Sequence, residues 1–282
     1  MNEQKMDILE LIHASYYQLT AAERKVADYV LSRQTQVQFM SITQLADECG
    51  TAEATVSRFC RSLKLKGFNA FKMELARFSA MGTETKEDLP FDSLPGRNQE
   101  IARLAIDAVN QTVELVSEGD IKLCVELFEK AGRVYCFGAG GSMLMAKEFA
   151  HLFSNVTPKF IAVSDSHMQM IAAASMTAED VMVLFSYSGA TTQGMQELEL
   201  ARSKGVKTVL VTRFNKSPAA KLADVVLRCG SNEGPFQFGS VPAKIAQLIL
   251  MDVLFQEYCA RNQKACEENT QAIAAALSSM HM

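Results

Sequence analysis

The sequence contains no tryptophan, only six prolines, and no apolar run that approaches the length of a membrane span. A helix needs about 18–20 consecutive apolar residues to cross a bilayer, so we expect no membrane partner. The residues from Met1 to Asp7 carry acidic side chains and no apolar core, which is not the pattern of a signal peptide. We therefore expect a cytoplasmic protein.

The seven cysteines lack the spacing of a functional cluster, because no C-x-x-C pair is present. Zinc sites need cysteines at short, regular separations, and disulfide frameworks need an oxidising compartment. Several cysteines stand among apolar neighbours instead, as Cys136 does between Tyr135 and Phe137. We expect reduced, buried thiols, and neither a metal site nor a bound cofactor.

With 282 residues, of which 48% are hydrophobic and 21% are charged, the chain is long enough for two globular domains. The net charge of −4 is unevenly spread, because residues 1–80 hold ten basic and nine acidic side chains, a net of +1. Between 58 and 77 there are six basic side chains and one acidic one, a net of +5. This stretch predicts either contacts with a phosphate backbone or a solvated helix face.

Residues 1–80 have the pattern of an all-α domain. The segment Thr20–Glu23 is typical of a capping box, and Ser41–Gln44 is a second, weaker one. Apolar residues behind each box repeat at helical spacing until Gly50 interrupts the pattern. Two short helices joined across Gly50 have the dimensions of a helix-turn-helix motif, although an ordinary helical hairpin would give the same pattern.

The helix after Gly50 is the candidate recognition helix. Val56, Phe59 and Leu63 would form its inward face. Side chains suited to base edges and phosphates would then point outward. On this helix and in the basic stretch behind it, the candidate DNA-binding residues are Thr55, Ser57, Arg58, Arg61, Lys64 and Lys66.

Residues 81–98 lack periodicity and contain two prolines and two glycines, so we expect a linker there. From 99 to 282, helical stretches alternate with short apolar strands, predicted at 133–137, 159–163, 181–186, 207–212 and 224–228. This alternation predicts an α/β domain with a five-stranded parallel sheet, doubly wound and flanked by helices on both faces. Ligands of such sheets bind beyond the carboxyl ends of the strands.

The strongest functional signal is the segment Ser186-Tyr-Ser-Gly-Ala-Thr191, which follows the third predicted strand. A tight turn at Gly189 could aim the hydroxyls of Ser186, Ser188 and Thr191 at one point. A helical pattern begins directly afterwards, and the free N–H groups at a helix N-terminus favour an anion. The segment therefore predicts a phosphate group held by uncharged donors.

A second candidate lies after the first strand, where Gly138-Ala-Gly-Gly-Ser142 precedes another helix. Close backbone approach at Gly140 and the hydroxyl of Ser142 would again suit an anion. The same glycines could belong to a dinucleotide-binding fingerprint with Asp165 as the ribose-binding acid, but Met143 stands where the third glycine belongs. An NAD-responsive regulator is thus an alternative, although dinucleotide folds need no second hydroxyl-rich loop.

In the order of these motifs the chain resembles the RpiR-type family of bacterial transcription regulators, which join an N-terminal helix-turn-helix to a sugar-isomerase (SIS) domain. The resemblance covers nearly the whole sequence. It rests chiefly on Ala54–Phe59, Lys66–Lys72, Gly138–Ser142, Ser186–Thr191 and Val211–Pro218.

Two positions in the helix-turn-helix depart from the family pattern. Ala52 stands where the family usually has a serine that caps the recognition helix, a role that Thr51 could take. Lys64 stands where the family usually has a glycine just after that helix, so the residue at which the helix ends is open. Lys64 could instead add a phosphate contact.

The resemblance implies a homodimer or homotetramer that binds a palindromic operator in double-stranded DNA and a phosphorylated sugar in the SIS domain. The residues that match the family's phosphate and sugar contacts are Ser142, Ser186, Ser188 and Thr191. His167 and Glu233 are candidate partners of the sugar hydroxyls, although His167 could equally be an ordinary loop residue. Tyr187, between two of the serines, is expected to point away from them and pack.

These features favour a transcription regulator, and more specifically a repressor, of a carbohydrate-metabolism operon that responds to a phosphorylated sugar. The alternative is a sugar-phosphate isomerase with an accessory helical domain. Isomerisation needs a base that moves a proton between adjacent carbons, and Glu233 and His167 are the residues that could serve. No paired acid and base stand at convincing spacing, so we expect a protein that is not an enzyme.

Overall fold

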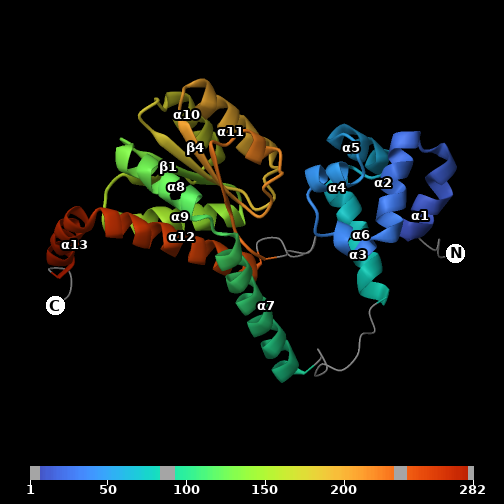
Figure 1. Ribbon diagram of the computed structural model, residues 1–282, viewed down its shortest axis with the longest axis horizontal. Helices are drawn as coiled ribbons and strands as arrows, with labels where there is room; N and C mark the ends of the chain where they lie inside the picture. The colour runs from blue at the N-terminus through green and yellow to red at the C-terminus, as the bar shows by residue number, and fades with distance from the viewer. Residues whose placement is uncertain (1–6, 83–92, 232–239, 279–282) are drawn as a thin grey trace. The chain divides into compact units, whose positions relative to one another are not determined.

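The computed structural model describes residues 7–82, 93–231 and 240–278. The chain forms two compact units, with the boundary between Glu100 and Ile101. The N-terminal unit is all-helical and the C-terminal unit is α/β (Figure 1). Within the described residues no helix is long and apolar enough to span a bilayer.

The N-terminal unit confirms the all-α prediction. Its helices are α1 (Ile8–Ser15), α2 (Ala21–Ser32), α3 (Gln34–Val37), α4 (Ile42–Glu48), α5 (Glu53–Ser62) and α6 (Phe68–Gly82), with a 3-10 turn at Tyr16–Gln18. Both predicted capping boxes are present, at the starts of α2 and α4. The inward faces of the helices bury one core, in which the rings of Phe59 and Phe71 meet edge to face at 5.4 Å.

Helix α5 is unusual at both of its ends. Ala52 has the extended backbone of an N-cap residue, but it offers no side-chain acceptor to the helix. The expectation that Thr51 substitutes is wrong, because its hydroxyl is buried without a partner among the described residues. At the other end the helix stops at Ser62, and Lys64 takes the left-handed conformation, with φ of +59°, that glycine adopts most easily.

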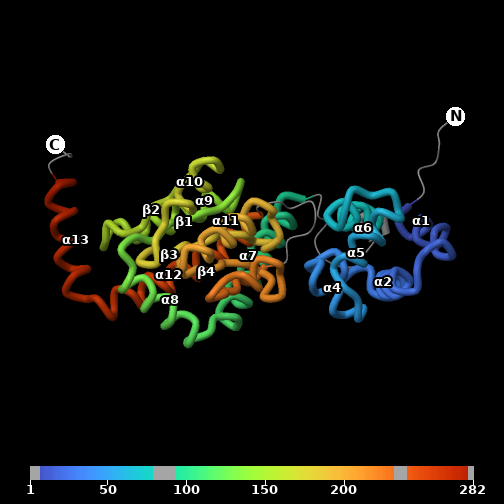
Figure 2. Tube along the Cα trace, turned by 90° about the horizontal axis from the view of Figure 1, so that it is seen from above, coloured from blue at the N-terminus to red at the C-terminus, as the bar shows by residue number. Residues whose placement is uncertain are grey.

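The C-terminal unit is built on five parallel strands in the order β2-β1-β3-β4-β5. They are β1 (Val134–Gly138), β2 (Phe160–Ala162), β3 (Val181–Phe185), β4 (Lys207–Thr212) and β5 (Val225–Arg228). The order β2, β1, β3, β4 can be followed in Figure 2. All five predicted strands are confirmed, and their ends shift by one residue at most.

Helices cover both faces of the sheet. α8 (Glu118–Lys130), α9 (Gly141–Ser154) and α12 (Val241–Arg261) pack on one face, and α10 (Ser166–Ser175) and α11 (Thr192–Ser203) pack on the other (Figure 1). Strand β3 serves both cores, because Val183 and Phe185 point into the first and Met182 and Leu184 into the second. The doubly wound prediction is therefore confirmed.

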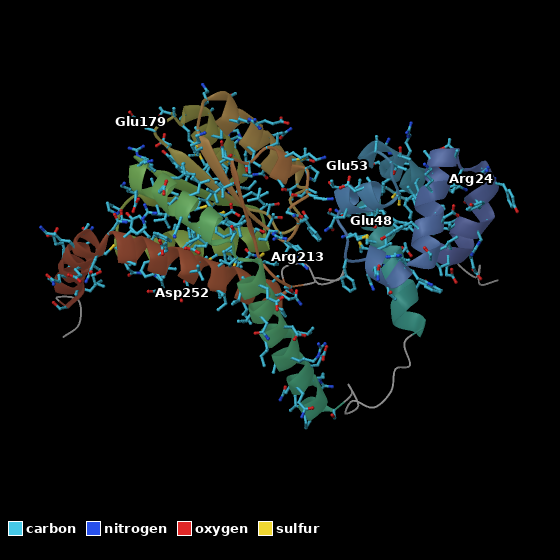
Figure 3. The ribbon with its side chains drawn as sticks, in the orientation of Figure 1. Arg24, Glu48, Glu53, Glu179, Arg213 and Asp252 are labelled. Atoms are coloured by element: carbon cyan, nitrogen blue, oxygen red, sulfur yellow. The ribbon has the colours of Figure 1, made fainter. Side chains whose placement is uncertain are left out.

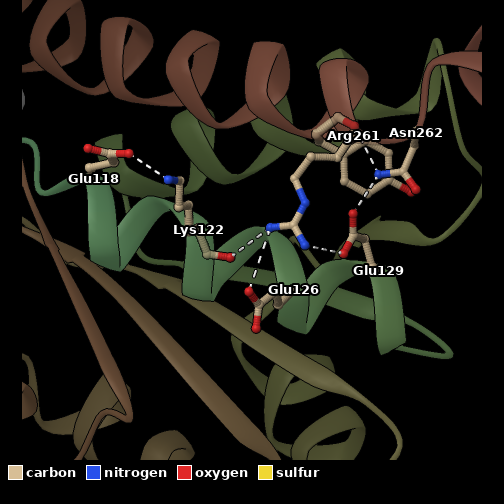
Figure 4. A network of polar contacts seen from close by, with 7 residues as sticks. Glu118, Lys122, Glu126, Glu129, Arg261 and Asn262 are labelled. Carbon is tan, nitrogen blue, oxygen red and sulfur yellow. Dashed lines mark hydrogen bonds and ion pairs between the residues drawn. The ribbon is translucent and has the colours of Figure 1, made fainter.

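The helices outside these two layers are α7 (Leu94–Leu115) and α13 (Gln263–Ser278). α7 begins inside the predicted linker, because Pro95 stands in its first turn, where a helix tolerates proline. The end of α12 is fastened to α8 where Arg261 and Asn262 both bind the carboxylate of Glu129, at 3.0 and 2.9 Å (Figure 4). All seven cysteines are free thiols, and six of them are buried.

Replacing Ala52 with serine should stabilise the N-terminal unit. A serine hydroxyl at this N-cap position would accept a hydrogen bond from a free N–H group in the first turn of α5, which typically contributes about 1 kcal/mol. Thermal unfolding should show a midpoint that is higher by about 2–8 °C in Ala52→Ser than in the wild type. Ala54→Ser, inside the helix, is the matched control and should not raise the midpoint. Equal midpoints for Ala52→Ser and the wild type would contradict this account of α5.

Candidate functional site

The DNA-binding candidates lie on α5 and in the turn behind it. Arg58, Arg61, Lys64 and Lys66 are exposed, and Ser57 is half-buried. The two arginines are three residues apart, so their side chains lie on the same face of α5. The two lysines follow the last turn of the helix. Together they form an exposed basic surface of the kind that contacts a phosphate backbone.

Thr55 lies elsewhere than the sequence analysis predicts. Its side chain is only 4% exposed, because Thr55 stands one turn before Phe59 and shares the inward face of the helix. The hydroxyl of Thr55 accepts a hydrogen bond from Nη2 of Arg58 at 3.2 Å. The prediction that Thr55 points outward is therefore wrong. The residue that it contacts, Arg58, is the one that is exposed.

The predicted phosphate loop follows β3 and leads into α11. Gly189 has a φ of +58°, and a Cβ there would lie 2.1 Å from Oγ of Ser217, so only glycine fits this turn. Ser186 is buried, and its Oγ has no hydrogen-bond partner among the described residues. Leaving a buried hydroxyl without a partner is costly, so this atom marks a place where a bound group would supply the missing hydrogen bond.

Ser188 and Thr191 stand at the start of α11. Thr191 is the N-cap residue, yet its side chain makes no capping hydrogen bond. The hydroxyl of Ser188 is half-buried and accepts from the N–H of Ala190 at 3.3 Å. The first N–H groups of α11 therefore point out of the helix without a capping side chain from the N-cap. This arrangement of N–H and O–H donors suits a phosphate group.

The β1–α9 turn repeats this arrangement on the neighbouring strand. β1 and β3 are adjacent at the point where the strand order reverses, which is where doubly wound sheets bind ligands. A Cβ on Gly138 would lie 2.8 Å from the backbone of Ser142, so the turn folds back tightly on the strand. Gly140, with a φ of +54°, is the N-cap of α9 and provides no side-chain cap. Two uncapped helix N-termini thus lie at one edge of the sheet.

His167 lies at the same edge, in the first turn of α10 after β2, and its side chain is exposed. The N-cap of α10 is Asp165, whose carboxylate accepts from the N–H of Met168 at 2.9 Å. Asp165 therefore has a capping role that the dinucleotide alternative does not anticipate. Glu233, the other predicted partner of the sugar, lies outside the described residues. Among the described residues, no cluster of histidine, cysteine and acidic side chains could hold a metal ion.

A buried polar network behind these turns was missed by the sequence analysis. Gln169 of α10 donates from Nε2 to the carbonyl oxygens of Gly138 and Val163, at 2.9 and 2.7 Å. Its Oε1 accepts from Gln193 of α11 at 3.0 Å, and Gln193 also donates to Glu197 at 2.6 Å. One amide thus connects the β1–α9 turn with α10 and α11, which carry the effector candidates. The sequence signal is weak, because it consists of one glutamine at an inward helical position.

A helix-turn-helix unit and an α/β unit with two turns suited to an anion, joined in one chain, define the class of this protein: a DNA-binding regulator with a small-molecule domain. Comparison with known proteins agrees with this class. A family model described as the helix-turn-helix domain of the rpiR family matches residues 6–81, and a SIS domain model matches residues 127–256.

Relatives match along nearly the whole chain. An uncharacterised HTH-type transcriptional regulator of Caldanaerobacter subterraneus is 31% identical over 251 residues, which covers 88% of this chain and 89% of that protein. The HTH-type transcriptional regulator HexR of Escherichia coli is 28% identical over 277 residues, covering 96% and 94%. The solved structure of the Vibrio vulnificus NanR protein complexed with ManNAc-6P has a TM-score of 0.88 at 26% identity, covering 98% and 100%.

The chain belongs to the rpiR family of helix-turn-helix transcription regulators. Its relatives over the full length are named as regulators, so the isomerase alternative is set aside and the protein is a transcription regulator rather than an enzyme. The helix-turn-helix implies DNA as a partner, and the SIS domain implies a phosphosugar ligand.

The stability of the protein should depend on the ionisation of Glu197. Burial raises the pKa of this carboxyl to about 7, although the hydrogen bond from Gln193 opposes the rise. Because the pKa is higher in the folded chain than in the unfolded chain, the protonated form stabilises the fold. Stability is therefore lost as pH rises from about 4.5 to about 7.

Glu197→Gln removes this titration and keeps an acceptor for Gln193. It should raise the free energy of unfolding at pH 8, by no more than about 3 kcal/mol, and change it little below pH 5. Denaturant unfolding at both pH values measures the difference. The matched control is Glu199→Gln, an exposed carboxylate on the same helix, which should behave like the wild type. A gain of equal size at both pH values would count against the titration of Glu197.

Proposed function

We propose that the protein represses a carbohydrate-metabolism operon and responds to a phosphorylated sugar bound at the carboxyl ends of β1 and β3. The domain over 1–80 binds DNA, and the domain over 99–282 binds the effector. The observation that carries the proposal is the buried hydroxyl of Ser186, which has no hydrogen-bond partner in the part of the chain that the structure describes, beside the uncapped start of α11. Uncharged donors at a helix N-terminus suit a phosphate monoester. The relative complexed with ManNAc-6P supports the same ligand chemistry.

In this proposal the phosphate group binds between the two turns. Ser186, Ser188 and Thr191 hold it from the side of β3, and Ser142 with the backbone at Gly140 holds it from the side of β1. His167 is then available to the sugar ring, together with Glu233. In this arrangement N–H and O–H donors recognise the phosphate group.

We further propose that the regulator acts as a homodimer or homotetramer on a palindromic operator. Four apolar side chains of α7 are 58–63% exposed, and these are Leu94, Ile101, Ile106 and Val113. Exposed apolar side chains gathered on one helix favour a surface that another copy of the chain covers. Two helix-turn-helix units related by a two-fold axis would read two symmetric half-sites.

The recognition-helix assignment predicts the effect of removing the arginines. Arg58→Ala and Arg61→Ala should each weaken binding to an operator selected from random duplex DNA, and should make the salt dependence of binding shallower by about one unit of slope. Fluorescence anisotropy at several salt concentrations measures both effects. Lys204→Ala, an exposed lysine at the end of α11, is the matched control. Affinity that stays at the wild-type value in both arginine variants would remove α5 from the DNA interface.

If residues 186–191 hold the phosphate group, a mutation there should remove sugar-phosphate binding without removing operator binding. Ser188→Ala should abolish the thermal shift caused by ManNAc-6P or hexose 6-phosphates, and it should leave operator binding intact, because α5 is unchanged. Ser203→Ala, near the C-terminal end of α11, is the matched control and should respond like the wild type. A double variant, Ser186→Ala with Ser188→Ala, that still responded normally would show that the loop is not the phosphate site.

A further inference from the structure

Tyr187 lies between Ser186 and Ser188 and does more than the predicted packing. Its ring meets Phe214 edge to face at 5.9 Å, which confirms that the side chain packs. Its hydroxyl, however, donates a hydrogen bond of 2.8 Å to the carbonyl oxygen of Ser231, a residue 44 positions further along the chain. The phosphate loop is thus tied to the segment that follows β5.

Ser231 is held in an unusual conformation. It is buried, and it has a φ of +108°, which a residue with a side chain rarely adopts. Its carbonyl oxygen accepts a second hydrogen bond, 2.9 Å long, from Nε of Arg213, and its N–H donates to Oε1 of Gln111 at 3.3 Å. Arg213 is labelled in Figure 3. A backbone with such a φ persists only where its surroundings hold it, and here both the N–H and the carbonyl oxygen of Ser231 form hydrogen bonds.

Gln111 belongs to α7, and the contact between α7 and the segment after β5 is close. A Cβ on Gly230 would lie 2.5 Å from Cβ of Gln111 and 2.6 Å from the backbone nitrogen of Thr112. The N–H of Gly230 donates to Oγ1 of Thr112 at 2.9 Å, and that hydroxyl donates to the carbonyl of Ala108 at 2.6 Å. The part of α7 around Gln111 and Thr112 therefore cannot shift without moving residues 230 and 231.

Tyr187 therefore connects two features that the sequence separates widely. On one side are the two serines of the phosphate loop. On the other side is α7, which Tyr187 reaches through Ser231. In the sequence, α7 is the first helix after the N-terminal helical domain. The backbone of Tyr187 is itself anchored, because its carbonyl accepts from Oγ1 of Thr212 at 3.0 Å and from the N–H of Arg213 at 3.1 Å.

We propose that Tyr187 is a positioning residue that transmits effector occupancy from the phosphate loop to α7 through the carbonyl of Ser231. This inference rests on the proposed function, because it assumes that a phosphorylated sugar binds at Ser186 and Ser188. The carbonyl of Tyr187 is anchored, so when the two serines close on a phosphate group the change falls on the side chain between them, and its hydroxyl carries that change to Ser231. Gln111 and Gly230 then pass the change to α7. A ligand can shift α7 only if it favours one of two such arrangements.

Tyr187→Phe tests this inference in the full-length protein. The variant keeps the ring and its packing and loses the bond to Ser231. It should bind ManNAc-6P or a hexose 6-phosphate within about twofold of the wild type. In the wild type the sugar phosphate should change operator affinity by about 5- to 150-fold, and in Tyr187→Phe by less than about twofold. Calorimetry measures the first quantity and anisotropy with the selected operator the second.

Two further variants make the result specific. Tyr135→Phe is the matched control, because the hydroxyl of Tyr135 on β1 contacts Arg133 at 3.3 Å and no part of the phosphate loop. It should respond like the wild type. Gln111→Leu removes the acceptor at the other end of the path and should lose the response as Tyr187→Phe does. If both residues serve one path, the double variant should be no worse than either single variant.

The possible outcomes separate the two proposals. A full response in Tyr187→Phe overturns the role of Tyr187 and leaves the proposed function intact. Sugar-phosphate binding that is more than about tenfold weaker in Tyr187→Phe also overturns it, because the hydroxyl would then act on binding rather than on transmission. A wild-type protein that binds none of these compounds overturns the proposed function, and the inference with it.

Discussion

The missing side chain at Gly189 is the constraint on which the proposed effector site depends. The turn after β3 is so tight that Oγ of Ser217 occupies the place of a Cβ, at 2.1 Å. This tightness keeps Ser186 buried at the end of the strand while Thr191, five residues later, already begins a helix. Any larger residue would push the turn outward and separate the hydroxyl from the helix N-terminus. The geometry of the N–H and O–H donors in this turn therefore depends on Gly189, which has no side chain.

The surroundings of this turn show why the hydroxyl of Ser186 stands out. Behind it, the amide of Gln169 satisfies two carbonyl groups and receives a hydrogen bond from Gln193. Each such bond contributes roughly 1 kcal/mol, and losing one partner costs about 1–3 kcal/mol. Within the described residues, buried side-chain atoms without a partner occur in Arg24, Thr51 and Ser186. Of these, Ser186 alone lies in the C-terminal unit, at the edge where doubly wound sheets bind ligands.

The sequence predicts the sheet well because buried parallel strands are short apolar runs, and the strand at Val181–Phe185 is recognisable from its composition. The capping boxes are local and equally readable. Side-chain direction is harder to predict. Thr55 looks like an outward polar residue, but helix packing turns it inward, and the hydroxyl of Thr51 makes no capping hydrogen bond to α5. The role of Gln169 depends on Gly138, which is 31 residues away, and no local pattern contains that information. The start of α7 is not predicted, because residues 81–98 lack periodicity and contain two prolines and two glycines, whereas Pro95 stands in the first turn of the helix, where proline is tolerated.

Lys64 has a left-handed backbone, with a φ of +59°. Holding that conformation is a cost of folding. A lysine on a mobile loop would instead lose its backbone freedom on association, which weakens binding. In the proposed DNA interface the backbone of Lys64 is therefore preorganised, so that a small loss of domain stability leaves less conformational freedom to be lost on binding.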